Sequence, residues 1–207
     1  TPAASVPALA LEAARHCPGL ITDVASVKQP IMDKVRLERF IGGHPIAGTE
    51  NSGFESSVTG LFENRICVLT PTVASPQESL AKLEAFWKQV GSRVIRMDVQ
   101  THDRIFAGIS HLPHMVAFSL VNALVDMQGF DRQILQYSAG GFRDFTRIAA
   151  SDPVMWRDIA LLNRDNIVRA IEEFERSLHR LKQAISAGDE KMMESFFQKS
   201  RDTRREI

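Results

Sequence analysis

Residues 66–95 read ICVLTPTVASPQESLAKLEAFWKQVGSRVI, and they decide the fold class. A short apolar run over 66–70 comes first. A helical pattern over 76–90 follows, with apolar side chains on one face, and Gly91 ends it. A second short apolar run stands at 94–95. Strand, helix and strand in this order are typical of α/β layers with a largely parallel sheet.

The rest of the chain divides into two parts. Upstream of residue 66, helical and strand patterns alternate at 6–16, 20–22, 31–39 and 40–41. From residue 98 onward there is almost no strand signal. We therefore expect an α/β domain over 1–97 and an all-helical domain over 98–207.

The helical part carries two long apolar patterns. The first covers about 99–127. The second begins at Asp152-Pro153, a cap residue before a first-turn proline, and runs to Gly188. Inside it, apolar residues are spaced 4, 3, 4, 3 and 4 apart, at Ile167, Ile171, Phe174, Leu178, Leu181 and Ile185. Such a seam needs a partner helix, either within one bundle or across a subunit interface, and its length favours the interface.

Composition excludes several classes of protein. Twenty-five basic residues balance 25 acidic ones among 207, which argues against a nucleic-acid-binding face and a polybasic membrane binder. No run of 18 apolar residues occurs, so no membrane span is expected. Cys17 and Cys67 are too few for a disulfide scaffold and fit a reducing, cytoplasmic compartment.

The first candidate site is the stretch Gly42-Gly43-His44-Pro45. Pro45 favours an extended conformation at His44, and the glycines allow close approach of another group. We expect His44 in a turn at the carboxyl end of a strand, where α/β sheets bind ligands. Ser26 follows the preceding strand at the same edge and is placed to hydrogen-bond to His44. A surface turn is the alternative.

The second candidate is Ser110-His111-Leu112-Pro113-His114. His111 and His114 stand at i and i+3 of a helix, and Pro113 predicts a helix irregularity because it lacks an N–H. Contact with a small anion or substrate is the favoured interpretation. A metal site and two structural histidines are the alternatives.

The third candidate is the segment 139–147, in which two glycines precede Arg143, Asp144 and Arg147. The arginine fork suits a carboxylate or a phosphate. Interleaved phenylalanines favour a half-buried anion site over a surface charge array.

At these residues the chain closely resembles the prephenate dehydrogenase family, which includes arogenate and cyclohexadienyl dehydrogenases. The matching stretches are Thr1-Pro2, TDVASVK (22–28), GGHPIAGTENSG (42–53), SHLPH (110–114) and GGFRDFTRIAASDPVMWRD (140–158). The resemblance implies a partial Rossmann-type nucleotide-binding domain followed by an all-α dimerisation domain. It also implies NAD- or NADP-dependent oxidative decarboxylation of prephenate or arogenate in tyrosine biosynthesis, by a cytoplasmic homodimer without nucleic-acid or membrane partners.

The resemblance assigns roles to individual residues. His44 would be the catalytic base, with Ser26 orienting it. His114 and Arg147 would hold substrate carboxylates, with Glu50, Asp144 and Arg147 forming an ionic gate near the substrate. Further substrate contacts would be Ser110 and Thr49. Cofactor contacts would be Thr1, Pro2, Asp23 and Ser26, and no metal is expected.

The resemblance also implies a segment ahead of Thr1. No G-x-G-x-x-G occurs, so we expect the first strand, the glycine-rich turn and the acidic ribose-binding residue to precede this chain. Without them the fragment alone is expected to bind cofactor weakly. The alternative functions are a non-catalytic helical dimerisation module and a protein with a histidine-pair metal site.

Overall fold

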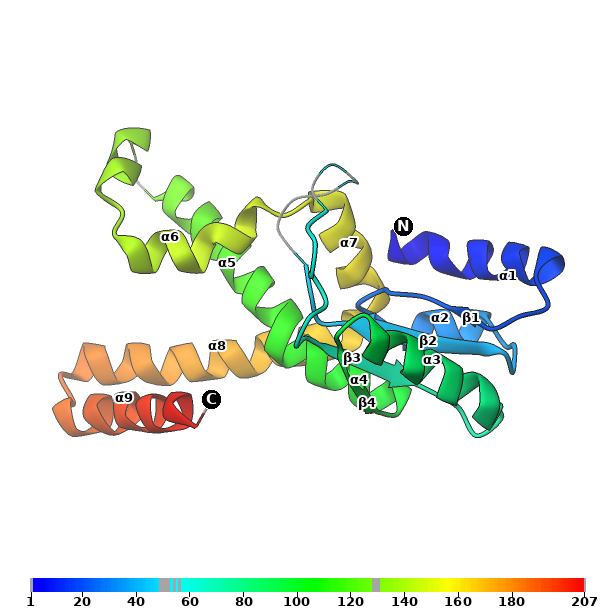
Figure 1. Ribbon diagram of the computed structural model, residues 1–207. Coiled ribbons are helices and arrows are strands. Elements are labelled where there is room, and N and C mark those ends of the chain that lie inside the picture. The colour runs from blue at the N-terminus through cyan, green and yellow to red at the C-terminus, as the bar shows by residue number, and fades with distance from the viewer. Residues whose placement is uncertain (1, 49–52, 54, 56, 128–130, 207) are drawn as a thin grey trace. The chain divides into compact units, whose positions relative to one another are not determined.

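The computed structural model describes residues 2–48, 53, 55, 57–127 and 131–206 (Figure 1). Two compact units emerge, Thr1–Ile167 and Val168–Ile207, and the boundary falls within one helix. In chain order the elements are η1 (Ala3–Ser5), α1 (Val6–His16), β1 (Ile21–Thr22), α2 (Gln29–Lys34), β2 (Phe40–Pro45), β3 (Ile66–Thr70), α3 (Gln77–Gln89), β4 (Arg93–Arg96), α4 (Val99–Phe106), η3 (Ala107–His111), α5 (Leu112–Asp126), η4 (Arg132–Tyr137), α6 (Gly140–Thr146), η5 (Arg147–Ala150), α7 (Pro153–Leu162), α8 (Arg164–Ala187) and α9 (Glu190–Arg205).

The α/β part contains a four-stranded sheet in the order β1-β2-β3-β4. The pairs β1–β2 and β3–β4 are parallel, but β2–β3 is antiparallel, with Gly43 opposite Leu69. The expectation of a largely parallel sheet is therefore wrong, and the sheet is mixed. A parallel neighbour needs a crossover connection, which is usually an α-helix. The described residues of 46–65 form no α-helix, and the chain returns beside β2.

The core of this part lies between the sheet and α3. Six side chains buried to 3% exposure or less form it, and they are Ile41, Cys67, Leu69, Leu80, Leu83 and Trp87. β1 differs from the buried strand that we expected over 20–22. It is two residues long, with Ile21 half-buried and Thr22 exposed.

The helix after β4 is irregular where Pro113 predicts it. α4 continues into a π-helical turn over Ala107–His111 and then into α5. Pro113 has no N–H to donate to the Ile109 carbonyl, which favours a change of hydrogen-bond register at this point. The π turn alters the direction in which the following side chains point.

The single helix expected from Pro153 to residue 187 is two helices, α7 and α8. They break at Asn163, whose side-chain amide donates to the Asp103 carbonyl at 2.8 Å and lies 3.2 Å from His111 Nδ1. Because these bonds join residues far apart in the sequence, the local hydrophobic pattern did not predict the break between α7 and α8. The cap at Asp152 is confirmed, because its carboxylate accepts from Val154 N.

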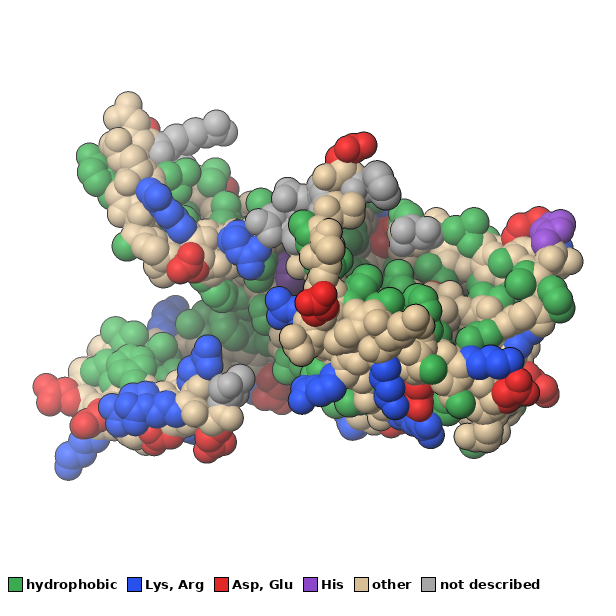
Figure 2. All heavy atoms as spheres, viewed as in Figure 1, with side chains coloured by type: hydrophobic (Ala, Val, Ile, Leu, Met, Phe, Trp, Pro, Cys, Tyr) green, Lys and Arg blue, Asp and Glu red, His purple; other side chains and the backbone are tan. Residues whose placement is uncertain are grey.

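The second unit is a helical hairpin. α8 ends at Gly188, whose φ of +64° allows the turn, and Asp189 caps α9 by accepting from Met192 N. α9 was not expected from the sequence. Part of the seam stays exposed in the single chain, since Leu178 and Ile185 are more than half exposed, and Figure 2 shows hydrophobic side chains over this hairpin.

Candidate functional site

His44 lies within β2, one residue before its end, and not in a turn after the strand. The two preceding glycines are required by close packing. A Cβ on Gly43 would come 2.8 Å from the Asp23 carbonyl oxygen, and one on Gly42 would collide with the Thr70 hydroxyl on β3 and come 3.1 Å from Lys28 Cδ. The glycines therefore let the segment after β1 lie directly against β2.

A buried ion pair holds that segment in place. Lys28 Nζ donates to the Asp23 carboxylate and, at 2.7 Å, to the Gly43 carbonyl. The other Asp23 oxygen accepts from Gly43 N at 3.1 Å. Burial lowers the pKa of Lys28, although Asp23 opposes that shift. Lys28 was not expected at the site from the sequence, and Asp23, expected to contact the cofactor, is buried against this lysine.

The hydrogen-bond partner of His44 is a second histidine. His44 Nδ1 lies 2.8 Å from His102 Nε2, and His102 Nδ1 lies 2.8 Å from Asp103 Oδ1. The expected bond from Ser26 is not among those of the described residues. Ser26 and His44 nevertheless line the same pocket.

The environment of His44 favours its neutral form. Its exposed fraction is 7%. Burial is the main reason that the pKa of His44 lies well below its usual value. Three neighbours that carry or can carry positive charge lower it further, namely His102, Lys28 and His111. A neutral histidine at neutral pH has a lone pair available to accept a proton.

His44 opens onto a pocket of about 480 Å³. The pocket lies between the end of β2, the start of β3 and helices α5 and α7. Five of the predicted site residues line it, and they are Ser26, His44, Ser110, His114 and Arg147. The structure adds Arg65 and Trp156 to its wall, which the sequence analysis did not assign to the site. One cavity therefore gathers a neutral histidine and cationic groups.

The remaining predicted site residues lie elsewhere. Asp144 is exposed on α6 and does not line the pocket, and Pro2 is exposed ahead of η1. Thr1, Thr49 and Glu50 lie outside the described residues. Their roles stay predictions.

His111 and His114 have different surroundings despite their i, i+3 spacing. His114 lines the pocket and its Nδ1 donates to the Ser110 carbonyl at 2.9 Å. Its ring stacks on Trp156 with centroids 3.7 Å apart. His111 is fully buried, and burial lowers its pKa to about 4. Within the described part of the chain, no cluster of three His, Cys, Asp or Glu side chains is placed to hold a metal ion.

The protonation of His114 determines what it can bind. Burial lowers its pKa, the charge of Arg147 lowers it further, and the Ser110 carbonyl opposes the shift. Since Nδ1 donates to that carbonyl, neutral His114 presents an acceptor at Nε2. It can donate to a carboxylate only after it takes up a proton.

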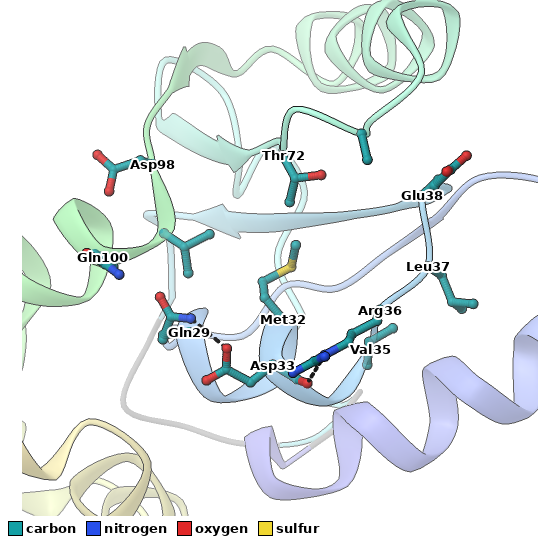
Figure 3. Close-up of a pocket in the computed structure, with 12 residues that line it drawn as sticks. Gln29, Met32, Asp33, Val35, Arg36, Leu37, Glu38, Thr72, Asp98 and Gln100 are labelled. Atoms are coloured by element: carbon teal, nitrogen blue, oxygen red, sulfur yellow. Dashed lines mark hydrogen bonds between the residues drawn. The ribbon is translucent and has the colours of Figure 1, made fainter.

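A second pocket of about 520 Å³ lies at the opposite end of β2 (Figure 3). Two of its polar side chains bond within or next to α2, since Gln29 donates to Asp33 Oδ1 and Arg36 to the Asp33 carbonyl. None of the candidate site residues lines it. We therefore take the pocket at His44 as the candidate active site.

The segment Val99–Asp126 is long and apolar enough to cross a membrane by length and composition alone, which the sequence analysis did not expect. One such helix is a weak sign of a span. Its first half carries His102, Asp103 and His111, which are buried against protein groups.

The comparisons with known proteins agree on one family. Residues 4–96 match "Prephenate dehydrogenase, nucleotide-binding domain", and residues 98–199 match "Prephenate dehydrogenase, dimerization domain". The cyclohexadienyl dehydrogenase of Zymomonas mobilis is 34% identical over 96% of this chain and 71% of that protein. The prephenate dehydrogenase of Bacillus subtilis is 36% identical over 89% of this chain, and the chain spans about half of its length, 51%.

A solved structure extends the likeness to three dimensions. Prephenate dehydrogenase from Aquifex aeolicus, in complex with hydroxyphenyl propionate and NAD+, superimposes with a TM-score of 0.93 at 40% identity. The match covers 100% of this chain and 74% of that one.

Proposed function

The chain belongs to the prephenate dehydrogenase family, and from this premise we propose that it takes part in the NAD- or NADP-dependent oxidative decarboxylation of prephenate or arogenate in tyrosine biosynthesis. The product would be 4-hydroxyphenylpyruvate or tyrosine. One observation carries the proposal: a buried, neutral His44 faces a pocket that His114 and Arg147 also line. A purely structural dimerisation module has no need of such a pocket.

Two described features fit a nicotinamide cofactor. The Ser26 hydroxyl lines the pocket and makes no hydrogen bond within the described part of the chain, so it is available to a ligand. η1, which Pro2 precedes, packs against α7, the helix that contributes Trp156 to the wall. When bound, the cofactor supplies the acceptor for the hydride that leaves the substrate ring.

His44 would receive a proton from the ring hydroxyl of the substrate. The O–H bond breaks toward Nε2 as hydride leaves the carbon that carries the hydroxyl. The bond to the ring carboxylate then breaks and releases CO₂, its electron pair completes the aromatic ring, and the resulting phenolate oxygen takes back the proton held by His44. The low pKa of His44 keeps it unprotonated and ready for this step at neutral pH.

The remaining polar groups would bind and orient the substrate. The guanidinium of Arg147 suits one carboxylate bidentately. His114 would bind a carboxylate in its protonated form, which the indole of Trp156 stabilises from one face. Apolar side chains, among them Ile148, Met155 and Ile159, line the pocket beside these groups.

We also propose the arrangement of the whole protein. Residues 1–97 would form the C-terminal half of a dinucleotide-binding domain, and residues 98–207 the helical domain that dimerises and binds substrate. The exposed apolar seam of α8 supports the dimer. Cys17 and Cys67 are both free thiols, which fits a cytoplasmic location.

The test is turnover by the full-length protein, followed by the absorbance of reduced nicotinamide with each substrate and each cofactor. We expect His44→Asn to lower kcat by about 10²–10⁴-fold with little change in KM. The matched control is His16→Asn, an exposed histidine on α1, which should leave kcat unchanged. Retention of more than about a third of wild-type kcat in His44→Asn would exclude His44 as the base.

A further inference from the structure

A chain of buried hydrogen bonds leads away from the pocket behind His44. It runs from His44 Nδ1 to His102 Nε2 over 2.8 Å, and from His102 Nδ1 to Asp103 Oδ1 over 2.8 Å. His102 is 0% exposed and Asp103 is 2% exposed. The ring of Phe106 packs against both histidines, with centroids 4.7 and 4.6 Å away. Bulk water does not compete for these bonds.

The partners of Asp103 fix the direction of the chain of bonds. Its Oδ1 accepts from Lys28 N and its Oδ2 from Gln29 N, each at 2.8 Å. Both oxygens therefore act as acceptors. The group that faces Oδ1 from the ring of His102 must then be a donor, so the proton of His102 sits on Nδ1.

The same reasoning fixes the tautomer of His44. If His102 carries a single proton, that proton is on Nδ1, and Nε2 presents a lone pair to His44. His44 Nδ1 must then donate to it, which leaves His44 Nε2 without a proton. That nitrogen is the one available to the pocket that His44 lines.

We propose that His102 and Asp103 are positioning residues that hold His44 in the tautomer able to accept the substrate's proton at Nε2. The inference about the reaction rests on the proposed function, whereas the inference about the tautomer rests on the geometry alone. Free neutral imidazole populates both tautomers. Without His102 and Asp103, a fraction of the molecules would therefore carry the His44 proton on Nε2, where it blocks proton uptake.

The first test reads the tautomer directly in the substrate-free protein. Long-range ¹H–¹⁵N correlation spectra distinguish protonation at Nδ1 from protonation at Nε2, and His44→Asn identifies the His44 signal among the six histidines. We expect neutral His44 and His102, both protonated at Nδ1. A His44 protonated mainly at Nε2 would overturn the proposal.

The second test compares two substitutions of His102. In His102→Gln the amide oxygen can still accept from His44, whereas His102→Phe keeps the ring shape and offers no acceptor. We expect His102→Phe to lower kcat by at least about tenfold with KM nearly unchanged. The reason is that holding a catalytic histidine in the wrong tautomer can lower kcat by up to about 10⁴-fold. Gln should recover most of the loss, and the His44 signal should move toward Nε2 protonation only in the Phe variant.

The melting temperature of each variant separates positioning from stability. If Gln and Phe lose kcat equally, or if kcat follows the melting temperature and the His44 tautomer stays the same, His102 is only structural. Failure of the proposed function looks different. The wild type would then turn over neither substrate, while the spectra would still report the tautomer of His44.

Discussion

The imidazole of His114 stacks on the indole of Trp156 with ring centroids 3.7 Å apart and an angle of 24° between the planes. Both rings line the candidate active site. An indole face stabilises a cation above it, so this contact favours the form of His114 that can donate to a carboxylate.

Replacement of Trp156 should therefore weaken substrate binding. We expect Trp156→Leu to raise KM by about two- to tenfold, since an aromatic pair is worth about 0.5–1.5 kcal/mol beyond area burial, and Trp156→Phe to raise it less. Trp87→Phe is the matched control, because Trp87 lies on α3, is buried between that helix and the sheet, and does not line the pocket. It should lower the melting temperature without changing KM. Equal KM values for Trp156→Leu and the wild type would exclude this role.

The pH dependence of KM should reveal the protonation of His114. Its pKa lies below the usual value because of burial, so its cationic fraction falls as pH rises above that pKa. If carboxylate binding needs the cation, KM rises with pH and approaches tenfold per pH unit. His114→Asn should flatten the profile, and His16→Asn should keep the wild-type slope. A KM that is independent of pH between about 6 and 8 would contradict the carboxylate role of His114.

Substitution of Arg147 should act mainly on KM. Arg147→Lys keeps the charge and loses the planar fork, whereas Arg147→Ala loses both. A charge-assisted hydrogen bond is worth about 1.5–3 kcal/mol, so Ala should raise KM by about tenfold to more than a hundredfold, with Lys in between. Arg143→Ala, on exposed α6, is the control. If both Arg147 variants melt earlier and keep a normal KM, Arg147 shapes the fold and does not anchor substrate.

The exposed apolar seam of α8 predicts a dimer, and a charged side chain introduced into this seam should weaken the dimer interface. Leu178 is 52% exposed in the single chain, and an obligate interface buries about 2,000 Å² or more. We expect light scattering to give the mass of a dimer for the wild type at micromolar concentration and a smaller mass for Leu178→Asp. Arg176→Asp, on the opposite side of the helix, should remain dimeric. A monomeric wild type would reject this interface.

The predictable parts of the fold depend on neighbours in the sequence. Three features were recognisable because the residues that form each of them are close together in the chain. They are the strand–helix–strand stretch over 66–95, the cap at Asp152 and the helix end at Gly188. The α7–α8 break was not, because Asn163 bonds to groups 52 and 60 residues away. The antiparallel pairing of β2 with β3 likewise depends on the path of the connection 46–65, which local sequence patterns do not determine.

The site divides in the same way. Motif residues such as His44, Ser110 and Arg147 were identified from the sequence, and the pocket brings them together. The partner of His44 was not identified, since His102 lies 58 residues further along the chain. The His-Asp pair at 102–103, at the start of the helix after the last strand, was the available signal.

The antiparallel return of β3 has a consequence for how related sequences can diverge. Ile46 N donates to the Ile66 carbonyl at 2.7 Å, so both ends of the connection 46–65 are fastened to the sheet beside the pocket. Residues near each end, Ala47 and Arg65, line it. Doubling the length of such a connection costs only about 0.6 kcal/mol of closure entropy. Residues can therefore be added to this connection during evolution at a small cost in stability, while the position of His44 stays the same.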